Sequence, residues 1–222
     1  MRKHWMAVAA VGCACGAFAG AASAHGGRGG GRGPGPGYGP DHASTLDLYY
    51  VPSANIEFFD GDDDGDGFGG KAAFRISRGV FLTGEYQQNT YDEQDRDLDQ
   101  FRLGMAFGPG AGNGEGLYGR VQYVNYDLER PEGSLGPDPK EQDGIAGHVG
   151  FTLPLSPQFR LFGEVGYLST DDFDGPEFVG GAILQVAPNL GIYGDYRATR
   201  LEDDSEDPVD LDDVRVGVRF TF

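Results

Sequence analysis

Hydrophobic and polar residues alternate strictly along residues 214–222, which read VRVGVRFTF. Every second position from Val214 to Phe222 is apolar, and arginine, glycine or threonine fills each position between. A period of two residues is that of a β-strand with one apolar and one polar face. The segment therefore predicts a strand that separates an apolar from a polar environment.

The same alternation recurs in ten segments. They are residues 45–59, 68–77, 80–91, 98–107, 117–128, 145–153, 159–169, 177–186, 190–201 and 214–222. About ten residues is the length of a tilted transmembrane strand, and closure into a barrel leaves no unpaired strand edge in hydrocarbon. We therefore predict an all-β fold, an antiparallel up-and-down transmembrane β-barrel over residues 44–222. The predicted number of strands is ten, with eight as the alternative if the weaker fifth and eighth segments are loops.

The N-terminus has the features of a secretory signal peptide. Arg2 and Lys3 precede an apolar run over residues 6–22, and residues 22–24 form an A-x-A cleavage site. Removal of residues 1–24 would also remove both cysteines, so we expect no disulfide or thiolate chemistry. Residues 25–43 are dominated by glycine and proline, which predicts a disordered tail.

Composition agrees with strands rather than membrane helices. The mean hydropathy is −0.40, and after residue 24 no segment approaches the roughly 18 consecutive apolar residues of a membrane helix. A helical membrane protein is therefore excluded. The 39 glycines and 12% aromatic residues suit closely packed, tilted strands.

Acidic residues are sorted by connection. The connections around 60–66, 92–97, 129–143, 171–177 and 202–213 hold 26 of the 35 acidic residues, whereas the intervening turns hold only Glu115. Without residues 1–24, 15 basic and 35 acidic residues give a net charge of −20. We expect one acidic rim that attracts cations, and no binding of nucleic acid, which needs a basic surface.

One acidic connection resembles the start of a calcium loop. Residues 60–66 read DGDDDGD, so oxygen ligands recur at alternate positions. Position twelve of such a loop would be Lys71 instead of glutamate. Weak binding of Ca²⁺ or Mg²⁺ and a merely solvated acidic loop both remain open, and no other cofactor is expected. The candidate ligands are Asp60, Asp62, Asp64 and Asp66.

The polar faces of the predicted strands carry nearly balanced charge, with eight basic and six acidic residues that include Asp47 and Glu177. A small barrel has an interior just wide enough for side chains to fill, and buried charges must be paired. We predict a closed lumen filled by ion pairs, with a narrow ion pathway as the alternative. The predicted network comprises Glu57, Lys71, Arg75, Glu85, Arg102, Arg120, Arg160, Glu164, Asp195, Arg197, Arg215 and Arg219.

No catalytic constellation is present in the sequence. After residue 24 the histidines are His25, His42 and His148, and the first two lie in the predicted tail. His148 stands alone on a polar strand face, which suggests a hydrogen-bonded lumen residue rather than a general base. We expect no enzymatic activity.

The alternating strands, the terminal Phe222 and the alternation of long and short connections resemble the OmpA/OmpX-like small outer-membrane β-barrel proteins. The resemblance covers residues 45–222 and implies an outer-membrane location, with the long connections outside and the tail in the periplasm. It also implies that Phe220 and Phe222 belong to a signal for the barrel assembly machinery, and that outer-membrane lipid and lipopolysaccharide surround a monomer. It does not imply an activity, because fold does not determine function.

Two functional hypotheses follow from the sequence. The first is a structural or surface-interaction protein that supports envelope integrity and displays acidic loops. The second is a transport protein, either a narrow channel or a ligand-binding barrel.

Overall fold

A computed structural model describes residues 43–58, 61–91, 96–112, 114–129, 141–203 and 208–222. The predicted signal peptide and nearly all of the predicted tail lie outside these residues. Within the described residues, no helix is long and apolar enough to cross a membrane.

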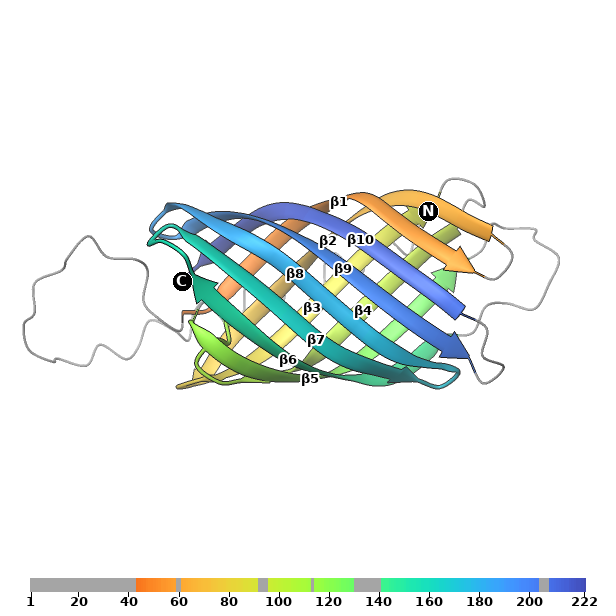
Figure 1. Ribbon diagram of the computed structural model, residues 1–222, viewed down its shortest axis with the longest axis horizontal. Helices are drawn as coiled ribbons and strands as arrows, with labels where there is room; N and C mark the ends of the chain where they lie inside the picture. Colours follow the sequence, from red (N-terminus) through yellow and green to blue (C-terminus); the bar gives the residue numbers. More distant parts are fainter. Residues whose placement is uncertain (1–42, 59–60, 92–95, 113, 130–140, 204–207) are drawn as a thin grey trace, which may run out of the picture. The chain divides into compact units, whose positions relative to one another are not determined.

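Ten antiparallel strands close into a barrel, so the prediction of ten strands is confirmed (Figure 1). Neighbours in sequence are neighbours in the barrel, and β1 pairs with β10 to close it. The strands are β1 (Thr45–Phe58), β2 (Gly61–Ser77), β3 (Val80–Tyr91), β4 (Arg96–Phe107), β5 (Gly116–Glu129), β6 (Gln142–Pro154), β7 (Phe159–Thr170), β8 (Phe173–Ala187), β9 (Leu190–Asp203) and β10 (Pro208–Thr221). The two segments that could have been loops are β5 and β8.

The two ends of the barrel differ. At one, called the turn end, β2 joins β3, β4 joins β5, β6 joins β7 and β8 joins β9. The seam between β1 and β10 also finishes there, where the backbone amides of Ser44 and Phe222 each donate to the other residue's carbonyl at 3.0 Å. At the opposite end, called the loop end, β1 joins β2 and each later odd strand joins the next even strand.

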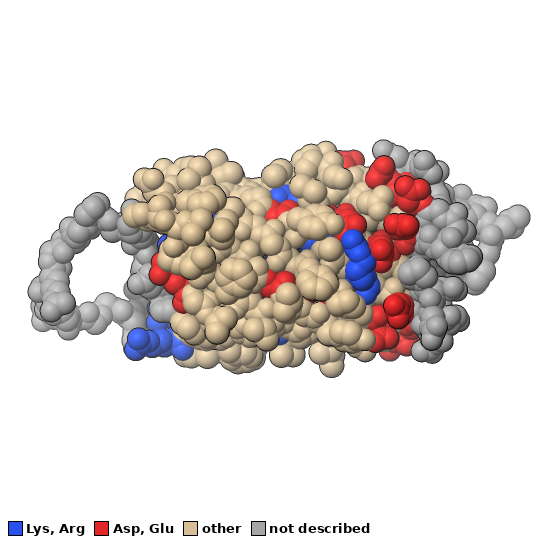
Figure 2. All heavy atoms as spheres, viewed as in Figure 1, with Lys and Arg blue, Asp and Glu red and all other residues tan. Residues whose placement is uncertain are grey.

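The outer surface of the barrel is a belt of apolar side chains. Leu48, Leu103, Val149 and Ile192 are each about half exposed and point outward from different strands. In Figure 2, uncharged residues cover most of the visible face, and the carboxylates are concentrated toward one end. Outside a lipid environment such a surface would be unusual, since soluble monomers rarely expose large contiguous apolar patches.

Several strands continue beyond their predicted ends into the acidic segments. The structure begins β2 at Gly61 rather than residue 68 and β10 at Pro208 rather than residue 214. The prediction of a loop over residues 60–66 is therefore wrong from Gly61 onward. Charged residues suggested loops, but at the loop end many of them occupy outward positions of strands that extend past the apolar belt, where polar side chains face water, whereas Asp63 and Asp213 point inward.

A bulge in β1 changes which side chains face inward. The register with both neighbouring strands shifts between Tyr50 and Ala54, beside Pro52, whose nitrogen cannot donate to the ladder. Beyond the bulge, Ala54 and Ile56 are buried and Glu57 is exposed. The prediction that Glu57 faces the lumen is therefore wrong, because one inserted residue reverses the alternation.

Candidate functional site: the filled lumen

The lumen holds nearly equal numbers of acidic and basic side chains. Within the described residues, its acidic groups are Asp47, Asp63, Glu85, Glu164, Glu177, Asp195 and Asp213, and its basic groups are Lys71, Arg102, Arg120, Arg160, Arg197, Arg215 and Arg219. All are buried or half-buried. The seven positive and seven negative charges of this set cancel, as expected where an uncompensated charge would be strongly unfavourable, and Arg96 adds a half-buried basic side chain at an inward position near the loop end of β4.

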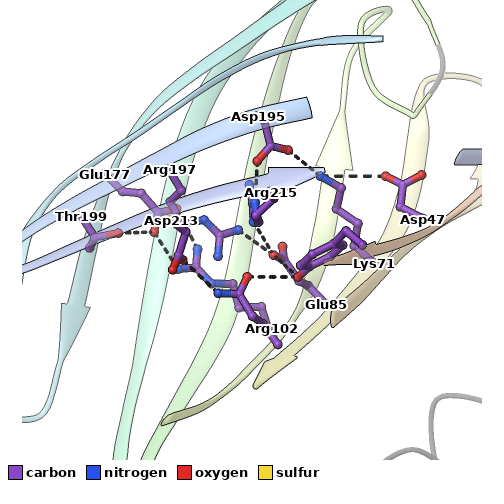
Figure 3. A network of polar contacts seen from close by, with 12 residues as sticks. Asp47, Lys71, Glu85, Arg102, Glu177, Asp195, Arg197, Thr199, Asp213 and Arg215 are labelled. Carbon is purple, nitrogen blue, oxygen red and sulfur yellow. Dashed lines mark hydrogen bonds and ion pairs between the residues drawn. The ribbon is translucent and has the colours of Figure 1, made fainter. Parts of the chain in front are cut away.

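Glu85 on β3 is a hub of this network (Figure 3). Its Oε1 atom accepts hydrogen bonds from Arg197 Nη2 at 2.7 Å and from Arg215 Nη1 at 2.8 Å. The hydroxyl of Tyr49 donates to the same oxygen at 3.1 Å. Since β3 is not a neighbour of β9 or β10, these contacts bridge the interior of the barrel.

A second group links Asp195 and Asp47 through cations. Asp195 accepts from Arg215 Nε at 2.5 Å and from Lys71 Nζ at 3.2 Å. Asp47 accepts two hydrogen bonds from Arg219, at 2.7 and 2.6 Å, and lies 3.9 Å from Lys71 Nζ. The Lys71 ammonium also lies 4.6 Å from the centroid of the Tyr193 ring, within cation–π distance.

Glu177 is the centre of a third group and is fully buried. Arg102 donates hydrogen bonds to both carboxylate oxygens, from Nη1 to Oε1 at 2.7 Å and from Nη2 to Oε2 at 2.6 Å. His148 Nε2 lies 2.9 Å from Oε1, and the Thr199 hydroxyl donates to Oε2 at 3.1 Å. His148 is therefore a hydrogen-bonded residue of the lumen.

Further polar side chains complete the layer. Arg120 pairs with Glu164, which also accepts from the Tyr118 hydroxyl at 2.7 Å. Asp213 accepts from the amide groups of Gln87 at 2.9 Å and Asn89 at 3.0 Å. Charge-assisted bonds of this kind are among the stronger hydrogen bonds of proteins.

Toward the loop end, apolar side chains fill the lumen. This apolar layer includes Ile56, Tyr91, Leu98, Val124, Leu168, Leu201 and Leu211, all of which are buried and belong to one cluster. They point inward from β1, β3, β4, β5, β7, β9 and β10. The layer places mainly apolar side chains between the ion pairs and the acidic rim, although Asp63, opposite Ile56, and Arg96, opposite Tyr91, share its level.

Toward the turn end, the connection between β4 and β5 folds against the lumen. Ala111 is 1% exposed and packs with Phe81 and Ala106. Gly112 has a positive φ of 65°, and a Cβ there would lie 2.4 Å from the Phe81 ring, so glycine suits this position sterically and conformationally. A cavity of about 100 Å³ remains between this connection and the ion pairs, lined in part by Lys71, Glu85, Arg120 and Glu164.

The lumen also contains residues that the sequence-based network omitted. Glu177 and Asp47 were placed on polar faces but not included in the network, and Asp63 and Asp213 were assigned to loops. A signal for Asp213 was available, because it stands two residues before Arg215 and so continues the inward alternation of β10. Asp63 likewise continues the inward series of β2 through glycines at 65, 67 and 69.

Two predicted network residues occupy other environments. Arg75 is exposed where β2 reaches the turn end, and Glu57 faces outward as described above. Arg160 is 6% exposed on the inward side of β7 near the same end. Phe220 on β10 and Phe222, directly after β10, are both exposed.

The candidate metal ligands lie along an extended strand. Asp62, Asp64 and Asp66 occupy alternate, outward positions of β2, where successive same-face residues are roughly 7 Å apart. Asp64 accepts from the Asn55 amide at 3.1 Å and Asp66 from the Tyr50 hydroxyl at 2.9 Å. In the part of the chain that the structure describes, no group of three or more His, Cys, Asp or Glu residues could hold a metal ion. Asp60 lies outside the described residues.

Comparison with known proteins gives similarity of fold but no family. No protein-family model matches the sequence, and no curated protein matches it. Among solved structures, Neisserial surface protein A is 14% identical, with a TM-score of 0.43 over 81% of this chain and 97% of that chain. The Escherichia coli outer membrane protease OmpT is 12% identical, with a TM-score of 0.47 over 82% and 97%. The KdgM porin, in complex with disordered oligogalacturonate, is 10% identical, with a TM-score of 0.39 over 80% and 99%.

Proposed function

We propose that this protein is an integral β-barrel of the bacterial outer membrane, closed to solutes, with a structural or surface-interaction role. The observation that carries the proposal is the contrast between the two faces of the same strands. Their outward positions form an apolar belt, and their inward positions form a filled lumen. Lipid around the barrel explains the apolar outward face, and a barrel that passes no solutes explains the filled lumen.

The lumen supports closure in two ways. Ion pairs such as Arg102–Glu177 and Arg197–Glu85 join strands that are not neighbours, so they cross the path that a solute would follow. The apolar layer adds a second barrier, because ions lose their hydration on entering hydrocarbon. The role proposed here includes no catalysis, and it assigns the loop end to the cell exterior.

The acidic loop end is the surface that this barrel would present outside the cell. Asp66, Asp99, Asp174 and Asp212 are among the carboxylates on its outward side. Such a surface would repel other anionic surfaces and attract cations or cationic partners. We propose lipopolysaccharide as the surrounding lipid of the outer leaflet.

A transport protein, either a narrow channel or a ligand-binding barrel, is the second candidate, and the cavity of about 100 Å³ favours the ligand-binding barrel. Arg120 Nε and Gln122 Oε1 belong to residues that line this cavity, and neither atom has a hydrogen-bond partner among the described residues. Both atoms are buried, so a small polar molecule in the cavity would reach them only if neighbouring side chains moved. Conductance across a planar bilayer separates the two candidates.

The location and barrel state can be tested in cells. The protein should fractionate with outer membranes and migrate differently in detergent gels before and after boiling, because a folded barrel resists the detergent until heated. Recovery in the soluble periplasmic fraction, with identical migration of boiled and unboiled samples, would reject the proposal.

A further inference from the structure

Five outward-facing tyrosines each donate a hydrogen bond to an aspartate on the next strand. The distances are 2.9 Å for Tyr50 to Asp66, 3.0 Å for Tyr86 to Asp99 and 2.8 Å for Tyr196 to Asp212. Tyr123 donates to Asp143, and Tyr167 donates to Asp174. Each pair belongs to one of the five hairpins that connect at the loop end.

The geometry is the same in every hairpin. The tyrosine lies directly opposite an apolar residue of the partner strand, and the aspartate stands two positions closer to the loop end. Tyr86 lies opposite Phe101, for example, and Asp99 precedes Phe101 by two residues. The opposite residues in the five hairpins are Phe68, Phe101, Ile145, Pro176 and Val214.

These pairs mark the level at which the outward surface changes character. On β7, the outward residue before Tyr167 is Val165, and the one after it is Ser169. On β5, Val121 precedes Tyr123 and Asn125 follows it. Outward residues toward the turn end are apolar on every strand, whereas charged outward residues such as Asp64, Asp97 and Asp210 lie toward the loop end.

We propose that the five Tyr–Asp pairs form an anchoring ring that fits the boundary between acyl chains and headgroups of a lipid bilayer and fixes the depth of the barrel. This inference rests on the proposed function, because it requires the apolar belt to lie in lipid. A tyrosine ring is apolar and its hydroxyl is polar, which favours the membrane interface. The aspartate satisfies the hydroxyl from the headgroup side.

The Tyr–Asp pairs restrict how deeply the barrel can lie in the bilayer. If the barrel moved toward its turn end, five carboxylates would enter hydrocarbon, where charge is strongly disfavoured. If it moved the other way, apolar residues such as Val165 would enter water. The opposite border of the belt has no equivalent pairs in the described residues, since the outward aromatic side chains there are phenylalanines, among them Phe74, Phe107 and Phe222.

The position of the boundary can be measured with two single-cysteine variants of β7. Val165→Cys and Ser169→Cys bracket Tyr167, and both positions are exposed on the outer face. The chain used would lack residues 1–24, so neither native cysteine interferes. In phospholipid vesicles, with a water-soluble maleimide on both sides of the membrane, we expect Ser169→Cys to react at least tenfold faster than Val165→Cys. Equal rates in vesicles would contradict a boundary at Tyr167.

The role of the pairs is tested by changing all five aspartates to asparagine in both cysteine variants. This lowers the penalty for immersing the ring, so the barrel should settle deeper and labelling of Ser169→Cys should slow at least threefold. Tyr193→Phe is the matched control, because Tyr193 lies inside the lumen and its hydroxyl has no partner among the described residues. It should leave both rates unchanged.

The outcomes separate this inference from the proposed function. If the variant with all five substitutions fails to fold, Asp174→Asn alone is used instead. Asp174 lies opposite position 169, so this single change should also slow labelling of Ser169→Cys. Unchanged labelling in folded aspartate variants, with Val165→Cys still protected, would overturn the anchoring ring only. Labelling of Val165→Cys as fast in vesicles as in urea-unfolded protein would instead reject the membrane-embedded belt and therefore the proposed function.

Discussion

Arg102 and Glu177 face each other across the lumen and form two hydrogen bonds of 2.7 and 2.6 Å. They lie on β4 and β8, which are separated by three strands around the barrel wall. Both side chains are no more than 1% exposed. The pair therefore crosses the interior, and both side chains are buried.

Replacing one partner should destabilise the barrel strongly. Arg102→Leu would leave Glu177 with only His148 and Thr199 as hydrogen-bond partners, and we expect a loss of roughly 3–5 kcal/mol in the free energy of unfolding. Reversible denaturant unfolding in detergent micelles or lipid vesicles measures this. Arg200→Leu is the control, since Arg200 pairs with Asp212 on the exposed surface and should contribute about 1 kcal/mol or less. Equal effects of the two variants would contradict a dry lumen.

Two glycines of β6 provide a matched test of which face is packed. A Cβ at Gly150 would lie 2.5 Å from the Tyr118 ring, whereas a Cβ at Gly147 would meet nothing within 4 Å. Gly150→Ala should therefore destabilise by roughly 1–3 kcal/mol through overpacking. Gly147→Ala should be neutral or slightly stabilising, because alanine lowers the entropy of the unfolded chain. The reverse ranking in the same unfolding assay would show that the inward and outward faces are misassigned.

The strand number and most inward faces could be predicted because a strand whose two faces meet an apolar exterior and a packed polar interior alternates strictly in sequence. Strand ends were harder to predict. Asp210 and Asp212 suggested a loop, but strands that extend beyond the apolar belt carry acids at outward positions without penalty. The bulge beside Pro52 was invisible to a strict two-residue period, and so Glu57 received the wrong face.

The partners within the lumen could not be predicted from sequence. Alternation shows that Arg102 and Glu177 both face inward, but only the closure of the barrel brings β4 opposite β8. The apolar layer was missed for a related reason. Leu98 and Leu168 lie inside predicted strands but at inward positions near their loop ends, where a polar face was expected, and Leu211 lies where the sequence pattern suggested a connection.

The proposed orientation predicts which connections antibodies reach on intact cells. An epitope inserted after Asp171, between β7 and β8, should be detected on intact cells. One inserted after Ser156, between β6 and β7, should be detected only after permeabilisation. The connection at 108–116 is a poorer site because Ala111 packs against Phe81. Detection of only the Ser156 epitope on intact cells would reverse the orientation.

Phe222 combines two roles that variants can separate. Its backbone closes the seam with Ser44, and its ring lies 6.2 Å from that of Phe74. Phe222→Ala keeps the backbone bonds, so it should refold in detergent almost as well as the parent protein but insert poorly in cells if the assembly machinery reads the aromatic side chain. Deleting Phe222 should impair both processes. Normal insertion of Phe222→Ala in cells would remove this residue from the assembly signal.

Single-channel recording in a planar lipid bilayer tests the closed lumen most directly. The ion pairs across the barrel and the apolar layer predict little or no steady conductance from the wild-type protein. Arg102→Leu combined with Leu168→Ser should increase leakage if the variant still inserts, which would show that the recording detects an opened lumen. A stable, large conductance from the wild-type barrel would contradict the closed lumen and favour the transport candidate.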